Sequence, residues 1–118
     1  MALYDGLGIC KFFIVISYGP TVLAEWLNSC TGWNTTPEDL MRTGERIFTA
    51  KRAINATRGL TRKDDSLPKR LLTVPQRDDI GPVSPLGMER MLTEYYRLRG
   101  WNADGAPTKA RLKKLGLA

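Results

Sequence analysis

The clearest helix signal in this 118-residue chain lies in residues 36–59, which read TPEDLMRTGERIFTAKRAINATRG. Thr36 belongs to the residue types that cap helix N-termini, and Pro37 suits the first helical position, where no backbone N–H is needed. Gly59 follows as a C-terminal stop. These signals predict a helix over about 37–58. Its inward stripe is expected to contain Leu40, Gly44, Ile47, Phe48 and Ile54, with Gly44 leaving room for a close neighbour.

Towards the N-terminus, the same reasoning predicts one further helix and one ambiguous segment. Residues 11–17 form a short apolar run that is compatible with helix or strand, and helix is favoured. Pro20 suits the first turn of a second helix, which should end near Cys30, before the Thr31-Gly32 break. One face of that helix carries Leu23, Trp26 and Leu27.

Towards the C-terminus, prolines and glycines mark a long irregular connection over about 60–84, in which residues 67–72 are expected to make a short helical turn. A helix over about 86–99 should stop at Gly100. Thr108 should cap a final turn or two. The residues expected to face inward on these last two elements are Met88, Met91, Leu92, Tyr95, Leu112 and Leu115.

No alternating strand pattern of any length appears in the chain. The predicted fold class is therefore all-α, with residues 1–118 forming a single helical domain of four to five helices. A chain of this length is about one domain and can bury a real core.

The net charge of +6 is concentrated in one part of the chain. Residues 1–50 carry more acidic than basic groups, whereas residues 51–118 carry fifteen basic and seven acidic groups. The expected interpretation of this basic charge is a solvated face. The alternative is a basic helical module that binds protein or nucleic acid. The basic residues expected at this solvated surface are Lys63, Lys69, Arg70, Lys113 and Lys114.

The chain contains no histidine. This removes the commonest general base and the commonest metal ligand, which argues against a self-contained hydrolase triad or zinc site. Cys10 and Cys30 lack C-x-x-C spacing and suggest a cytoplasmic protein rather than a disulfide-stapled secreted one. The apolar run at residues 12–16 is too short to span a bilayer and is expected to be buried structure.

The segment Asp5-Gly6-Leu7-Gly8-Ile9-Cys10-Lys11-Phe12 combines an acid, two glycines and a thiol just before the apolar run. Glycine lets a backbone bend and come close to a ligand, because no Cβ intervenes. A carboxylate accepts hydrogen bonds, and a thiolate binds soft metals. By itself, D-x-x-G-x-C is a weak signal, since Asp5 could be a turn residue and Cys10 a buried structural thiol.

Five motifs in this chain resemble, in order, the C-terminal part of the tungsten- and molybdenum-dependent aldehyde ferredoxin oxidoreductases. They are residues 5–12, Thr31-Gly32-Trp33-Asn34 leading into Gly44-Glu45-Arg46-Ile47, Arg52-Ala53-Ile54-Asn55, Thr61 to Pro68, and Tyr95 to Asn102 with Gly105 and Pro107-Thr108 behind it. The resemblance covers nearly the whole chain.

This resemblance implies an enzyme that oxidises aldehydes to carboxylic acids and passes electrons from a bis-pterin tungsten or molybdenum centre through a 4Fe–4S cluster to ferredoxin. Residues 1–12 would then face the pterin and the cluster. Asp5 would accept hydrogen bonds from the pterin, and the Ile9 main chain would add a polar contact that Gly8 permits. Cys10 would be the last of the four thiolate ligands of the cluster. Cys30 has no such support and is expected to be core.

The chain departs from the family pattern because the other three cluster ligands are absent from it. We therefore expect a C-terminal fragment of a larger oxidoreductase, which alone would carry neither cofactor and would be inactive. Its expected partners are the remainder of the same enzyme, ferredoxin and the aldehyde, with no nucleic acid and no membrane. A homo-oligomer is left open. The alternative within the family is a non-catalytic helical scaffold subunit.

Overall fold

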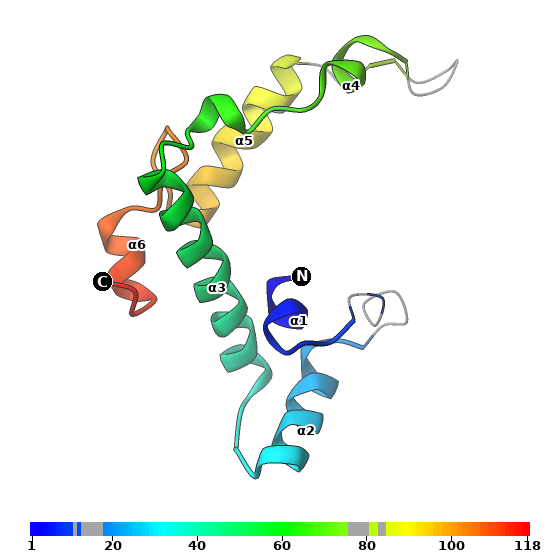
Figure 1. The fold of residues 1–118 in the computed structure, drawn as a ribbon, viewed down its shortest axis with the longest axis vertical. Coiled ribbons are helices and arrows are strands. Elements are labelled where there is room, and N and C mark those ends of the chain that lie inside the picture. Colours follow the sequence, from blue (N-terminus) through cyan, green and yellow to red (C-terminus); the bar gives the residue numbers. More distant parts are fainter. Residues whose placement is uncertain (11, 13–17, 76–80, 83–84) are drawn as a thin grey trace. The chain divides into compact units, whose positions relative to one another are not determined.

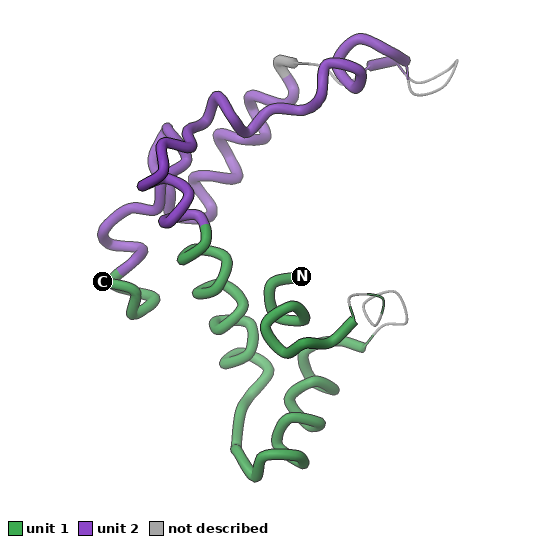
Figure 2. The backbone as a smooth tube through the Cα atoms, in the orientation of Figure 1, with its two compact units in different colours: residues 1–51, 113–118 green, residues 52–112 purple. Residues whose placement is uncertain are grey.

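The structure is a computed structural model in which the described residues are 1–10, 12, 18–75, 81–82 and 85–118. These residues contain six α-helices and no strand, so the all-α prediction is confirmed, with one helix more than expected. The residues fall into two compact units (Figure 2). The first unit contains residues 1–51 and 113–118, and the second contains residues 52–112.

The first unit is built from α1 (Ala2–Gly6), α2 (Pro20–Thr31) and the first turns of α3 (Pro37–Thr57), which are labelled in Figure 1. Its hydrophobic core joins residues from these three helices. The buried members are Leu3, Tyr4, Leu23, Ala24 and Leu40, and Leu7, Ile9 and Leu27 pack against them.

Helix α1 is the helix that the sequence did not predict, because residues 5–8 read as a glycine turn. A five-residue helix is not stable in isolation, because ordering the first helical turn costs more free energy than its few hydrogen bonds recover. Burial of Leu3 and Tyr4 holds this one in place, and the Tyr4 hydroxyl donates a hydrogen bond to the Tyr18 carbonyl oxygen. A Cβ on Gly44 would lie 3.3 Å from the Leu3 Cβ. The close neighbour predicted for Gly44 is thus α1.

The predicted ends of α3 are confirmed. The Thr36 hydroxyl oxygen accepts a hydrogen bond from the Asp39 N–H (3.1 Å), and the Asp39 carboxylate accepts one from the Thr36 N–H (3.1 Å). This reciprocal capping box satisfies N–H groups at the helix start, and the hydrogen bonds from Thr36 lower the pKa of the Asp39 carboxyl. At the other end the Leu60 N–H donates to the Asn55 carbonyl oxygen (3.1 Å), as a glycine stop at Gly59 requires.

Helix α2 also has the predicted bounds, with Pro20 in its first turn and Gly32 directly after it. Its inward face is narrower than predicted. Leu23 is buried and Leu27 packs on the core, but the Trp26 side chain is 41% exposed and lies against Tyr18, with ring centroids 5.1 Å apart. Cys30 was expected to be core, but it is exposed in the last turn of α2.

The second unit contains the end of α3, a short 3-10 helix (Arg62–Asp64), α4 (Lys69–Thr73), α5 (Pro85–Arg99) and most of α6 (Lys109–Lys114). The short turn expected at residues 67–72 is α4, so the long connection contains two short helical pieces. Thr108 caps α6 as predicted, because its hydroxyl oxygen accepts a hydrogen bond from the Arg111 N–H (3.2 Å). Leu115, in the first unit, is buried as predicted.

The buried face of α5 differs from the prediction. Met91 is 68% exposed and Tyr95 is half-exposed, whereas Tyr96 is buried. A similar shift occurs in α3, where Ile54 is exposed and Arg52 is buried. The physical reason is the polar network around Arg52, which buries the faces that carry Tyr96 and Arg52. Apolar periodicity in the sequence could not indicate a network of polar groups.

The remaining expectation, a helix over residues 11–17, lies almost entirely outside the described residues. Among the helices that the structure does describe, none combines the length and the apolar character that a membrane crossing demands.

Candidate functional site

The predicted site residues lie together at the C-terminal end of α1. Asp5 occupies the last turn of the helix, and its carboxylate is exposed. Gly8 has φ of +68° and ends the helix, because the Ile9 N–H donates to the Tyr4 carbonyl oxygen (2.9 Å). A Cβ added to Gly8 would meet no atom within 4 Å. Cys10 follows with an exposed, free thiol. This end of α1 therefore presents one carboxylate and one thiol to the outside of the unit.

The described part of the chain does not complete a metal site around Cys10. No group of three or more His, Cys, Asp or Glu side chains converges anywhere among the described residues. Cys30, the second thiol of the chain, is exposed near the end of α2. The end of α1 thus offers one exposed thiol.

A second group of matched motifs meets in the second unit, where it forms a partly buried ion pair. The Arg52 guanidinium binds the Asp65 carboxylate through two parallel hydrogen bonds of 2.8 and 2.6 Å, and its Nε donates to the Gly105 carbonyl oxygen (2.8 Å). The Tyr96 hydroxyl donates to the same carboxylate. Arg52 also lies over the Trp101 ring, 5.3 Å from the ring centroid. Bidentate pairing of this kind is strong and directional.

Each partner in this network changes the pKa of the others. Burial, the largest single effect, raises the pKa of the Asp65 carboxyl, but the hydrogen bonds from Arg52 and Tyr96 outweigh it and leave that pKa below its usual value. Burial and the hydrogen bond to Asp65 raise the pKa of Tyr96 to about 12. The network therefore favours an ionised Asp65 and a neutral Tyr96. It links α3 to α5 through Asp65 and holds the backbone carbonyl of Gly105.

The shifted pKa values predict how stability depends on pH. A carboxyl with a lowered pKa in the folded state stabilises the fold above its unfolded pKa of about 4, and this contribution is lost as pH falls through the folded value. A tyrosine with a raised pKa stabilises the fold below about pH 10, and this contribution is lost as pH rises towards 12.

We therefore expect that Asp65→Asn lowers the free energy of unfolding at pH 7, and that its difference from the unmodified chain shrinks between about pH 5 and pH 2. Urea denaturation followed by circular dichroism across this range checks the expectation. Asp104→Asn, at an exposed carboxylate of the same unit, is the control. A difference that stays constant with pH in the Asp65 variant would show that the carboxylate is not held ionised by Arg52.

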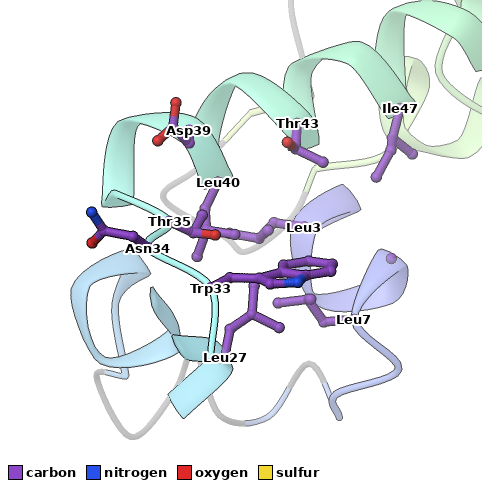
Figure 3. Close-up of a pocket in the computed structure, with 11 residues that line it drawn as sticks. Leu3, Leu7, Leu27, Trp33, Asn34, Thr35, Asp39, Leu40, Thr43 and Ile47 are labelled. Atoms are coloured by element: carbon purple, nitrogen blue, oxygen red, sulfur yellow. The ribbon is translucent and has the colours of Figure 1, made fainter. Parts of the chain in front are cut away.

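A pocket of about 370 Å³ opens in the first unit between α1, α3 and the connection that joins α2 to α3 (Figure 3). We call it the α1–α3 pocket. Its lining residues are Leu3, Gly6, Leu7, Leu27, Trp33, Asn34, Thr35, Asp39, Leu40, Thr43 and Ile47. The Trp33 side chain is 64% exposed and forms one wall of the pocket. Trp33 lies in the short loop between the end of α2 and the start of α3, and this position is the sequence signal that could have indicated its exposure.

The comparisons with known proteins agree with the order of motifs in the chain. The sequence family described as "Aldehyde ferredoxin oxidoreductase, domains 2 & 3" matches residues 1–117. The tungsten-containing aldehyde ferredoxin oxidoreductase of Pyrococcus furiosus is 39% identical over 118 residues. The protein of the same name from Thermococcus kodakarensis is 36% identical over 118 residues. In both cases the match covers 99% of this chain and 19% of the relative.

A solved structure is also similar, namely the active-site complex BamBC of benzoyl coenzyme A reductase in complex with 1,5-dienoyl-CoA. Its TM-score is 0.70 at 31% identity, over 85% of this chain and 14% of that chain. The chain thus spans about a fifth of the length of the curated relatives and less of this structure. Since the family match covers nearly every residue, the chain belongs to the aldehyde ferredoxin oxidoreductase family and corresponds to sequence from its domains 2 and 3.

Proposed function

We propose that this chain is the C-terminal domain of an oxidoreductase that oxidises aldehydes to carboxylic acids and delivers the electrons to ferredoxin. The observation that carries the proposal is the exposed Asp5–Cys10 segment at the end of α1, within a chain that matches the family from end to end. The cofactors would be a bis-pterin tungsten or molybdenum centre and a 4Fe–4S cluster. The names of the relatives favour tungsten.

The residues at the end of α1 fit these groups. The Cys10 thiol is exposed and free, as a cluster ligand must be before the cluster is bound. The Asp5 carboxylate is exposed and has no hydrogen bond or ion pair to another described residue, so it can accept hydrogen bonds from a planar donor edge. No atom lies within 4 Å of the position that a Cβ on Gly8 would take, so a flat ligand can approach the backbone there.

Each residue of the segment would have a separate role. Asp5 would bind and orient the pterin, and Cys10 would hold one iron of the cluster as a thiolate. Because the Ile9 N–H is already bonded to Tyr4, the main-chain contact of Ile9 would come from its carbonyl oxygen. One short segment would thereby touch both groups, which keeps the path for electrons short. When bound, the metal centre supplies the oxidation of the aldehyde and the cluster supplies electron transfer.

The chain by itself offers one of the four thiolates that such a cluster requires. We therefore expect the isolated chain to hold neither group and to be inactive. Ferredoxin would be recognised by the complete enzyme, where complementary charge raises the rate of encounter. Lys69 and Arg70 are exposed basic residues of α4 and are candidates for such a contact.

The proposal is tested with the full-length enzyme, purified without oxygen. We expect it to contain tungsten or molybdenum together with iron, and to reduce ferredoxin only when an aldehyde is supplied. A panel of aliphatic and aromatic aldehydes would define the substrate. A metal-loaded enzyme that reduces ferredoxin with none of them would contradict the proposal.

The similarity to benzoyl coenzyme A reductase supports a second candidate, a reaction on an aromatic coenzyme A thioester. Its identity to this chain is 31%, below the 39% of the Pyrococcus furiosus relative, so aldehyde oxidation is favoured. Incubation of the same enzyme with benzoyl-CoA and a low-potential reductant distinguishes the two. Formation of a dienoyl-CoA product without aldehyde oxidation would favour the second candidate.

A further inference from the structure

Two of the polar residues that line the α1–α3 pocket, Thr35 and Asp39, already have hydrogen-bond partners within the first unit. The Asp39 carboxylate is bonded to the Thr36 N–H and hydroxyl, and the backbone N–H and carbonyl of Thr35 are both bonded to the Asn28 side chain, at 2.8 and 3.0 Å. Figure 3 shows the polar ends of Asp39 and Asn34 turned away from the Trp33 ring. A site for a polar small molecule would instead point several free polar groups at its ligand.

The loop that carries Trp33 is held in place, although the side chain itself is exposed. The Asn28 side chain bonds Thr35 on both its N–H and its carbonyl, and the Trp33 N–H donates to the Thr31 hydroxyl (3.2 Å). The Trp33 and Ile47 side chains are 64% and 39% exposed beside the pocket. A large aromatic side chain that is exposed on an ordered loop, next to an apolar hollow, is typical of an interaction surface.

The position of the pocket indicates what covers it. Gly6 and Leu7 line the pocket and lead directly into the proposed cofactor segment at residues 8–10. If Cys10 binds a 4Fe–4S cluster, the remaining thiolates come from outside this chain, so another part of the enzyme must lie against this end of α1. The chain covers 19% of its curated relatives, which leaves ample polypeptide for that role.

We propose that the α1–α3 pocket receives apolar side chains from the remainder of the same polypeptide, and that Trp33 is the anchor of this contact. The inference rests on the proposed function, because it uses the need for further cluster ligands beside Cys10. The contact would seat the α1 end against the part of the enzyme that completes the cluster. Trp33, Leu7 and Ile47 would then be buried in the full-length enzyme.

The test measures access to the pocket in the full-length enzyme. Thr43 lines the pocket and is exposed in this chain, whereas Met41 on the same helix is exposed and does not line it. Thr43→Cys and Met41→Cys are each treated with a maleimide, and mass spectrometry reads the labelling at that position. Each rate is divided by the rate of the same variant in urea. We expect the normalised labelling rate of Thr43→Cys to be at least about tenfold lower than that of Met41→Cys, since covered side chains react only after local opening.

Equal normalised rates for the two variants would overturn the inference, because the pocket would then be open in the complete enzyme. Protection of Thr43→Cys that disappears on dilution would assign the pocket to a second copy, and protection that requires added aldehyde would assign it to a substrate. Either result would also overturn the inference that the remainder of the polypeptide fills the pocket. Normal iron content together with an unprotected Thr43→Cys would retain the proposed function and reject this contact alone.

A second pair of variants checks the same contact independently. Thr43→Trp places a large side chain at the pocket, where it competes with the incoming apolar groups, and Met41→Trp adds the same side chain outside the pocket. We expect the melting temperature of the full-length enzyme to fall in the first variant and not in the second. Equal melting temperatures would speak against an occupied pocket.

Discussion

Replacing Cys10 by alanine in the full-length enzyme is expected to remove the iron–sulfur cluster. Alanine offers no donor atom, so three thiolates would remain for a group that requires four. Because the loss of an outer-shell partner already costs about 10–100-fold in metal affinity or activity, loss of a ligand should lower aldehyde-dependent ferredoxin reduction by about 100-fold or more. Iron analysis and the visible and electron paramagnetic resonance spectra of the reduced enzyme measure the cluster directly.

Cys30→Ala is the matched control for this variant. Cys30 is exposed and free, as Cys10 is, but it lies at the end of α2 and not beside the proposed cofactor segment. We expect Cys30→Ala to retain full iron content and activity. A Cys10→Ala enzyme with a normal cluster spectrum and normal turnover would refute the ligand assignment, and loss of iron in both variants would point to general instability.

Replacing Gly105 by alanine is expected to destabilise the second unit by about 2–5 kcal/mol, because crowding of a packed site costs about 1–3 kcal/mol and backbone strain adds to it. Gly105 has φ of +79°, and its carbonyl accepts the Arg52 Nε hydrogen bond. An added Cβ would lie 2.9 Å from the Tyr96 ring carbon and would overlap the Arg52 guanidinium. Arg52 would have to move away from Asp65, while the left-handed backbone itself costs about 1–2 kcal/mol for a residue with a side chain.

Gly59→Ala separates the two contributions. Gly59 has φ of +90°, but a Cβ there would meet no atom within 4 Å, so only the backbone strain is added. We expect Gly59→Ala to cost about 1 kcal/mol. Urea denaturation of the two variants, followed by circular dichroism, gives the difference that is due to crowding of Arg52. If Gly105→Ala costs no more than Gly59→Ala, the Arg52 network accommodates the added Cβ and the expected crowding is absent.

The helix ends were predictable because their signals are local. Thr36 and Asp39 form a capping box three residues apart, and Gly32 ends α2 through a backbone conformation that other residues adopt at a cost. These groups interact with their own neighbours in the chain. The corresponding predictions for α2, α3 and α6 are therefore confirmed to within a residue or two.

The buried faces were less predictable, because residues far apart in the chain decide them. Apolar spacing favoured Met91 and Tyr95 as the inward residues of α5, but the structure buries Tyr96, whose hydroxyl reaches Asp65 from thirty-one residues away. Helix α1 was missed for a related reason. Its five residues have no helical stability of their own, and the burial of Leu3 and Tyr4 holds them in place.

From the sequence alone, the ends of α2, α3 and α6, the all-α class and, through the order of the motifs, the family could be predicted. The sequence also drew attention to Asp5 and Cys10, whose cofactor roles stay predictions. Only the tertiary structure revealed that Arg52, Asp65, Tyr96 and Gly105 form one network, and that Trp33 stands at the edge of an apolar pocket. The physical reason is that caps and stops are formed by neighbours in the chain, whereas ion pairs and pockets join residues that only folding brings together.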